Sequence, residues 1–419
     1  MSLVKDRKIT VSEKSGKEII ILFFVWPLLS FVLALKNFGD KNNRKIIIAF
    51  FSFFGFTMNF ARESMDGFSH AENFRKTARM SYDSFSDILK SFVLQQSTSG
   101  QLDIYTTLVN FFVSRFTDSF HYVFLFHAFI FSYFSVKTFG IIYDEFEGKI
   151  SKNATVFFVL IFFLLPISIV HGIRFPIASW IYIYGAYQLL RTGSKKYLLF
   201  CLLACLAHFS FVLVFALTAA YAYLGNRNYI YSALLLSSIL FPTLLYSYFG
   251  SFDKADVGQG IQDKIAGYSR EDYIKMRNAN LEGRNWYARL RIPILQYTFY
   301  VILFVIAFVK RNYYKQDQVQ QNLASFLILF LSFVNFGFAF DSLGRRFLLI
   351  WFVFASIYIF RFFQLNNYKF YSTYTIVFAF PILLWILVQL RVALDLMTYM
   401  FILGNPLIAI FIEMDAILK

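Results

Sequence analysis

The chain has 419 residues, of which 58% are hydrophobic, 21% aromatic and only 16% charged. A soluble domain carries about 25% charged residues, so this composition excludes a soluble globular protein and, with a mean hydropathy of +0.56, predicts an all-α polytopic integral membrane protein. The net charge of +15 does not indicate nucleic-acid binding, because no basic run with interleaved stacking aromatics stands outside the apolar segments and the positive-inside rule explains most of the excess.

Long apolar stretches recur along the whole chain, each close to the roughly 17–25 residues that span hydrocarbon as a helix. We expect about 12 transmembrane helices, within a range of about 11–14, in one transmembrane domain over residues 1–419. The apolar stretches are 19–35, 46–61, 120–143, 154–170, 175–190, 196–224, 229–249, 292–309, 322–340, 346–363, 373–392 and 396–412.

The first stretch follows a charged head, and no small-residue cleavage pattern comes after it, so we expect it to stay in the protein. Two cysteines, Cys201 and Cys205, lie one helical turn apart in an apolar segment, without a histidine beside them at metal-ligand spacing. Because a free cysteine usually behaves as a small hydrophobic residue, we expect both in the core.

Three short basic loops, 36–45, 191–196 and 310–315, are assigned to the cytoplasm by the positive-inside rule. They share one side only if 196–224 forms two short helices that meet at His208-Phe209-Ser210, which is the reading we favour. One long tilted helix of about 43 Å is the alternative, and it would place 310–315 outside. The two-helix reading also puts the N-terminus outside, although its head is basic.

With this alternation, the unusual polar residues gather on the outer side. An extracytoplasmic segment, 62–118, is expected to contain interfacial helices, since Ser86–Leu94 is amphipathic and Asp103–Phe116 has apolar residues at helical spacing. A second loop, 250–291, is polar enough to cap a site, with structural padding as the alternative. The turns 171–176, 208–210 and 341–346 face the same side.

An arginine interrupts the apolar sequence near residue 174. The insertion His171–Pro176 separates the apolar runs Ile161–Val170 and Ile177–Leu190, so Arg174 has no long polar loop around it. A guanidinium near hydrocarbon costs on the order of a few kcal/mol unless it faces a polar cavity or pairs with an anion. Arginines clustered at the outer boundary suit bidentate phosphate binding, with snorkelling to lipid headgroups as the alternative for each.

Several chemistries have no sequence support. The chain has no Walker loop, GxSxG, HExxH or dinucleotide fingerprint. His121 and His127 are six residues apart, which is wrong for ligands on one helix face, so we expect them at helix interfaces or in the core. We expect no cofactor and no metal, and therefore activity in the presence of a chelator. Few acidic residues lie inside the predicted helices, which weakens an ion-coupled transporter.

Three successive motifs resemble those of the EpsG/Wzy-like bacterial polysaccharide polymerases. They are the stretch Ser168–Ala178 around Arg174, the basic turn Arg191–Lys196, and Ala207-His208-Phe209-Ser210. Asp66-Gly67-Phe68 and Gly344-Arg345-Arg346 are similar to an acidic, aromatic segment and a late arginine turn of that family, and Arg174 with Gly185 fits an Arg-(ten residues)-Gly spacing. Asp66 lacks the tyrosine pattern common in the EpsG branch, so the branch stays open.

The resemblance implies a multi-pass glycosyltransferase of the GT-C superfamily in the bacterial inner membrane. Such a polymerase works on the periplasmic or outer face and moves a glycan from one undecaprenyl pyrophosphate carrier to the terminal sugar of another lipid-linked repeat unit. Its partners would be this donor and acceptor, membrane lipids, a chain-length regulator and a flippase. An O-antigen ligase, or a flippase or transporter for lipid-linked or anionic substrates, are the alternatives.

The residues that we expect in the site divide into two groups. Substrate-binding residues would hold the donor pyrophosphate and stabilise the charge that develops on it, and a base would take the acceptor hydroxyl proton. The substrate-binding candidates are Arg174, Arg345, Arg346, Arg289, Arg291 and Asp341. The candidate bases are His208, His171 and Asp66.

Overall fold

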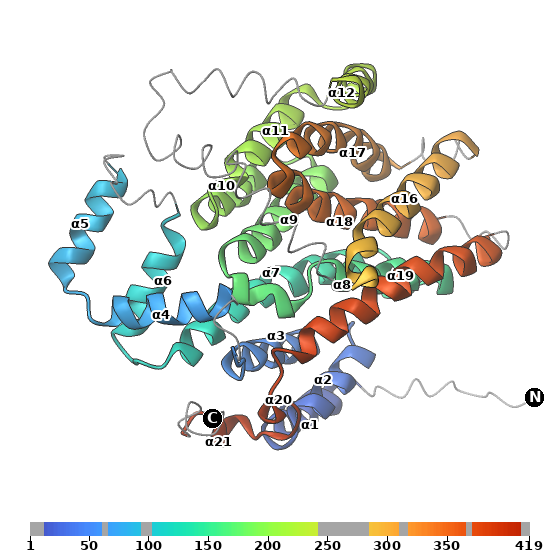
Figure 1. Cartoon of the computed structure of the whole chain (residues 1–419). Helices are drawn as coiled ribbons and strands as arrows, with labels where there is room; N and C mark the ends of the chain where they lie inside the picture. The colour runs from blue at the N-terminus through green and yellow to red at the C-terminus, as the bar shows by residue number, and fades with distance from the viewer. Residues whose placement is uncertain are drawn as a thin grey trace, which may run out of the picture.

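The computed structural model describes residues 12–60, 66–93, 103–241, 285–309, 317–365 and 371–411. These residues form helices and connecting turns, and they contain no strand (Figure 1). The predicted all-α class is therefore confirmed.

The helices follow one another along the chain with short turns between most of them. The first half contains α1 (Ser12–Val25), α2 (Pro27–Lys36), α3 (Lys41–Phe56), α4 (Asp66–Ala78), α5 (Tyr82–Val93), α6 (Tyr105–Ser114), α7 (Phe120–Asp144), α8 (Lys152–Leu164), the 3-10 turn η1 (Ile167–Gly172) and α9 (Arg174–Thr192). The second half contains η2 (Lys195–Tyr197), α10 (Leu198–Ala207), α11 (Phe211–Leu224), α12 (Asn228–Leu240), α16 (Trp286–Val309), α17 (Gln318–Gly337), η5 (Phe338–Phe340), α18 (Asp341–Leu365), α19 (Tyr371–Leu394), α20 (Tyr399–Leu403) and α21 (Pro406–Ala409).

Five helical segments of the described residues are long and apolar enough to cross a membrane. They are Phe120–Asp144, Lys152–Gly172, Trp286–Ala307, Gln318–Phe340 and Ser342–Leu365. Shorter apolar helices accompany them at Pro27–Lys36, Phe211–Leu224, Asn228–Leu240 and Phe378–Leu394. The chain is an all-α polytopic membrane protein.

Helix α9 lies at the centre of the bundle, among α7, α10, α17 and α18 (Figure 1). Every residue from Pro176 to Leu190 is buried, so this helix has no lipid-facing side. Gly185 permits the close approach of α10, because a Cβ there would lie 2.9 Å from the carbonyl oxygen of Tyr197. Any side chain at position 185 would push α10 away.

Residues 196–224 form two helices, as predicted. The backbone of His208 is extended between α10 and α11, which ends the first helix. Lys195, just before α10, has its Nζ 3.9 Å from the ring centroid of Tyr223, near the end of α11. The two helices are therefore antiparallel and return the chain to the end of the bundle from which it came. Cys201 and Cys205 are both buried, as expected.

Two predicted crossings differ from the structure. Stretch 19–35 bends at Pro27, and the Ser30 hydroxyl donates to the carbonyl of Ile19 at 2.8 Å, so α1 and α2 fold against each other and do not form one straight helix. Stretch 396–412 contains only the short helices α20 and α21, because the Gly404–Pro406 segment interrupts the helix. Hydropathy did not reveal either break, because the segments are apolar throughout. At each break a proline lacks the backbone N–H that would continue the preceding helix.

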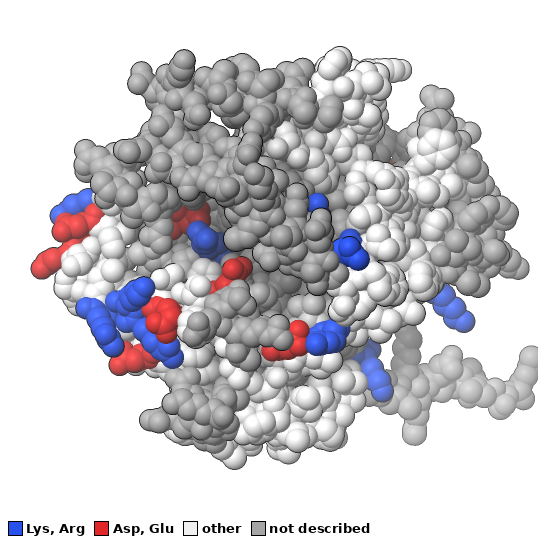
Figure 2. All heavy atoms as spheres, viewed as in Figure 1, with Lys and Arg blue, Asp and Glu red and all other residues white. Residues whose placement is uncertain are grey.

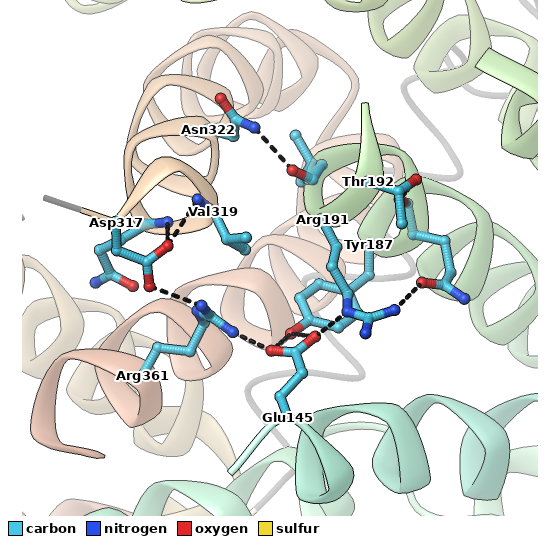
Figure 3. Close-up of polar contacts among 11 residues, drawn as sticks. Glu145, Tyr187, Arg191, Thr192, Asp317, Val319, Asn322 and Arg361 are labelled. Atoms are coloured by element: carbon cyan, nitrogen blue, oxygen red, sulfur yellow. Dashed lines mark hydrogen bonds and ion pairs between the residues drawn. The ribbon is translucent and has the colours of Figure 1, made fainter. Parts of the chain in front are cut away.

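A charged cluster joins four helices at the end of the bundle where the described basic loops lie. Figure 3 shows Glu145, after α7, between Arg191 of α9 and Arg361 of α18. Arg191 Nε lies 2.6 Å from Glu145 Oε1, Tyr187 donates to both carboxylate oxygens at 3.0 Å, and Arg361 also pairs with Asp317, the N-cap of α17, at 2.8 Å. Two half-buried carboxylates are thus neutralised by two guanidinium groups.

Reporter fusions test the alternation of the loops. Fusions after residues 40, 193 and 313 should all report a cytoplasmic location, and a fusion after residue 270 should report the opposite side. The structure supports the placement of loops 36–45 and 191–196 on the same side. Arg44, beside loop 36–45, pairs with Asp144 at 2.5 Å, close to Arg191 and Glu145. Residues 270 and 313 lie outside the described residues. A cytoplasmic signal at 270 would contradict the alternation.

Candidate functional site

The residues before α9 place Arg174 at the end of the bundle opposite to the Glu145 cluster. Helix α8 ends at Leu164, and the 3-10 turn η1 leads to Ile173. Ile173 is fully buried and has a φ of +44°, which is strained for a β-branched residue. Arg174 then begins a 19-residue helix that carries Arg191 in its last turn, about 26 Å away at 1.5 Å per residue.

A buried carboxylate fixes Arg174. Asp103 Oδ2 accepts from Arg174 Nη1 at 2.8 Å, and the exposed fractions of the two side chains are 2% for Asp103 and 42% for Arg174. The other oxygen of Asp103 accepts from the backbone N–H of Phe209 at 2.6 Å. One carboxylate therefore ties the start of α9 to the turn between α10 and α11, while most of the guanidinium stays outside this contact.

The two histidines beside Arg174 are held as different tautomers. His171 Nδ1 lies 2.7 Å from the carbonyl oxygen of Ser168, which can only accept, so Nδ1 carries the hydrogen and Nε2 presents a lone pair. His208 Nδ1 accepts from the backbone N–H of Ser210 at 3.2 Å, so in its neutral form the hydrogen is on Nε2. His171 is thus set up to accept a proton, and His208 to donate a hydrogen bond.

Asp66 and His70, both on α4, reach the same place. Asp66 is exposed, and its Oδ2 lies 3.8 Å from the point where a Cβ would stand on Gly172. Burial, together with the nearby Arg174, lowers the pKa of His70 to about 4, although the carboxylate of Asp66 acts in the opposite direction. His70 is therefore neutral near pH 7, although the sequence did not single it out as a site residue.

Arg346 completes the cluster from α18. Its guanidinium carbon lies 5.8 Å from the ring centroid of Phe175, and the same ring is 5.8 Å from that of His208. Arg345, the preceding residue, is half-buried. Five predicted site residues thus lie close together, on helices α4, α9 and α18, the turn η1 and the turn before α11. They are Asp66, His171, Arg174, His208 and Arg346.

Two other predicted residues, Arg289 and Arg291, lie away from this cluster. Arg289 is exposed on the first turn of α16. Arg291 is half-buried, with its guanidinium carbon 5.5 Å from the ring centroid of Trp385 on α19, and no contact joins either arginine to Arg174 among the described residues. The side chain of Asp341 and residues 250–284 of the predicted cap loop lie outside the described part of the chain.

Helices α4, α5 and α6 cover the site from one side. Figure 2 shows charged side chains gathered over α4 and α5, beside helix surfaces that are almost free of charge. A polar cavity of about 260 Å³ lies between these helices and Arg174. The helices α5 and α6 occur close to where amphipathic spacing predicted them.

The sequence did not reveal the polar residues that pair with the predicted site residues from distant segments of the chain. Asp103 was visible only as one acidic residue among several in a mixed loop, and its position before the amphipathic segment 103–116 was the available signal. His121 and His127 are buried in α7, as expected. Among the residues that the structure describes, no group of three or more His, Cys, Asp or Glu side chains is arranged to hold a metal ion.

Comparison with known proteins gives one match. A model described as the EpsG family matches residues 42–403, which is most of the chain. No curated protein and no solved structure matches it. The matched range includes α3 to α20, and therefore every residue that surrounds Arg174.

Proposed function

The chain belongs to the EpsG family, and from this membership and the cluster around Arg174 we propose that it is a glycosyltransferase that polymerises polysaccharide repeat units. The donor is a glycan on undecaprenyl pyrophosphate, and the acceptor is the terminal sugar of a second lipid-linked repeat unit. A membrane-embedded fold suits polyprenyl substrates, because their chains stay in the hydrocarbon while the sugars reach a polar site at the membrane boundary.

The observation that supports this proposal best is the position of Arg174. Its guanidinium has five N–H donors in a fork that matches phosphate oxygens, and Asp103 occupies one of them. The N-terminus of α9 adds a partial positive charge at the same place. Arg346 lies on the neighbouring Phe175 ring, so two guanidinium groups meet the donor pyrophosphate.

We propose the following reaction at these residues. The bond between the anomeric carbon of the donor and its pyrophosphate oxygen breaks, and a bond from the acceptor hydroxyl oxygen to that carbon forms. Arg174 and Arg346 stabilise the negative charge that the pyrophosphate gains, which is the largest contribution expected in such a site. The acceptor proton moves to His171 Nε2, whose lone pair is set by the contact of Nδ1 with Ser168.

The two histidines give a direct test of the base. His171→Ala should lower the rate of chain growth by about 10²–10⁴-fold, the usual contribution of a general base. His208→Asn should keep the rate within about 10-fold, because an asparagine oxygen can still accept from the N–H of Ser210. Initial rates with purified lipid-linked repeats measure both. Equal losses in the two variants would contradict the choice of His171.

The location and partners are part of the same proposal. The Arg174 end of the bundle faces the periplasm or the exterior, since the opposite end carries the described basic loops 36–45 and 191–196. A flippase would deliver the repeat units to this face, and a chain-length regulator would act on the growing product. Energy comes from the pyrophosphate leaving group.

A deletion strain tests the proposed reaction. Single lipid-linked repeats should accumulate on the outer leaflet, because they are delivered but not joined. Accumulation on the inner leaflet would instead indicate a flippase. Polymer that is made but not attached to its lipid A core would indicate a ligase.

A further inference from the structure

Most of the residues that line the cavity between α4, α5, α6 and Arg174 carry polar side chains. Its residues include Arg174, Asp103, Lys76, His70, Thr106 and Asn110. At about 260 Å³ it is larger than the roughly 30 Å³ that one water occupies, and slightly below the roughly 300–1,000 Å³ of sites for drug-sized ligands. It therefore suits one small polar ring.

Three of the residues that line the cavity each carry a buried polar atom that has no hydrogen-bond partner within the described chain. These atoms are His70 Nδ1, Thr106 Oγ1 and Asn110 Oδ1. Asn110 is only 3% exposed, so its oxygen is shielded from bulk solvent. An unpaired buried polar atom is costly, because it loses its hydrogen bonds to water without a replacement, and three such atoms in residues of one cavity indicate that a polar ligand pairs with them.

The walls of the cavity are held in place from outside. Arg115, at the end of α6, donates to the carbonyl of Ala78 on α4 at 3.2 Å. Tyr105, at the start of α6, bonds through its hydroxyl to His127 of α7 at 2.8 Å. The three unpaired atoms thus stand on anchored helices, and a bound group finds them already positioned.

We infer that this cavity binds one sugar residue of the lipid-linked glycan, through hydrogen bonds from its hydroxyl groups to His70, Thr106 and Asn110. The inference rests on the proposed function and adds a sugar-binding site to it. Hydroxyl groups both donate and accept, whereas a phosphate dianion offers only acceptor oxygens and leaves Asn110 Oδ1 unpaired. The neutral state of His70 is consistent with a hydroxyl partner, because an uncharged imidazole has one nitrogen that accepts a hydrogen bond.

The adjacent Arg174 gives the sugar site its place in the reaction. Arg174 lines the cavity and also forms the proposed pyrophosphate site. A sugar bound there lies next to the breaking bond, and the identity of its hydroxyl groups decides which glycans fit. His70, Thr106 and Asn110 are therefore residues that determine specificity.

Binding measurements on the purified full-length chain in lipid nanodiscs test the inference. The first probe is the repeat-unit oligosaccharide released by mild acid from lipid-linked material of the same bacterium, and the second is undecaprenyl pyrophosphate without sugar. Thr106→Val and Asn110→Leu should each weaken oligosaccharide binding by about 10-fold or more, as expected for a lost hydrogen bond to a buried partner. Neither should change the affinity for undecaprenyl pyrophosphate.

Thr77→Val is the matched control. Thr77 lines the same cavity, but its hydroxyl already donates to the carbonyl of Asn73 at 2.9 Å within α4. Its replacement should leave oligosaccharide binding unchanged. Valine has nearly the shape of threonine, so Thr106→Val decides the question if Asn110→Leu does not fold.

Two results would overturn the sugar site. They are no oligosaccharide binding by the wild-type chain, and equal affinities in wild type and Thr106→Val, which would mean that water alone fills the cavity. The test is separate from the proposed reaction. A chain that binds the oligosaccharide through Thr106 and makes no polymer would uphold the site and reject the polymerase. Normal polymerisation with unchanged binding in the variants would reject the site alone.

Discussion

Arg174→Ala is expected to abolish polymer while the protein remains in the membrane at the wild-type level. Removing one charge-stabilising donor from a pre-organised site typically costs about 10²–10³ in rate, and here the residue holds the leaving group itself. Chain length on a polysaccharide gel, with the protein level from an immunoblot of the same cells, measures both. Full-length polymer from Arg174→Ala would reject the assignment.

Two further variants separate chemistry from folding. Arg174→Lys keeps the positive charge beside Asp103 but loses the two-pronged contact with phosphate, so it should also fail. Arg174→Ala combined with Asp103→Asn leaves no unpaired buried carboxylate and should restore any lost stability, but not activity. Arg227→Ala is the control, because Arg227 is exposed at the turn between α11 and α12, away from the site.

Arg361→Ala should have the largest effect on stability, lowering the free energy of unfolding by about 3–5 kcal/mol. Arg361 is 5% exposed and bridges Glu145 and Asp317, so its loss leaves two carboxylates without their shared cation. Equilibrium unfolding in mixed detergent micelles, followed by tryptophan fluorescence, measures the change. Neutralising the partners as well, with Glu145→Gln and Asp317→Asn, should recover part of it.

Arg391→Ala is the control for this network. Arg391 pairs with Asp395 one turn away, and both side chains are largely exposed, at 60% and 46%. Water screens such a pair, so the unfolding transition should stay unchanged. Equal effects of Arg361→Ala and Arg391→Ala would show that the Glu145 cluster does not hold the four helices together.

Helix positions could be predicted from the sequence wherever one long apolar stretch forms one continuous helix. Helices α7, α17 and α18 lie where hydropathy predicted them, and charge alternation with the His208 break identified the α10–α11 pair. Hydropathy could not reveal the bend at Pro27 or the break before Pro406, because the residues on both sides of each are apolar. The position of a single proline determines where each of these two segments bends or breaks.

The site was only partly predictable for a different reason. Arg174 stood out because a lone arginine between apolar runs is costly. Its partner Asp103 is 71 residues away in the chain, and such a pairing has no periodicity that one sequence can reveal. The same holds for Glu145 and Arg361, which are separated by 216 residues. The packing of the helices brings each pair together, and the tautomers of His171 and His208 depend on backbone contacts that form only in the folded chain.

Reconstitution of the purified chain tests the proposed reaction most directly. The protein is placed in proteoliposomes with lipid-linked repeat units and no nucleotide, and the lipid-linked products are separated by length. The expected result is a ladder in which each product is one repeat longer than the last, with one undecaprenyl pyrophosphate released for each bond formed, and no ladder with Arg174→Ala. Movement of repeat units between leaflets without any increase in length would contradict a polymerase.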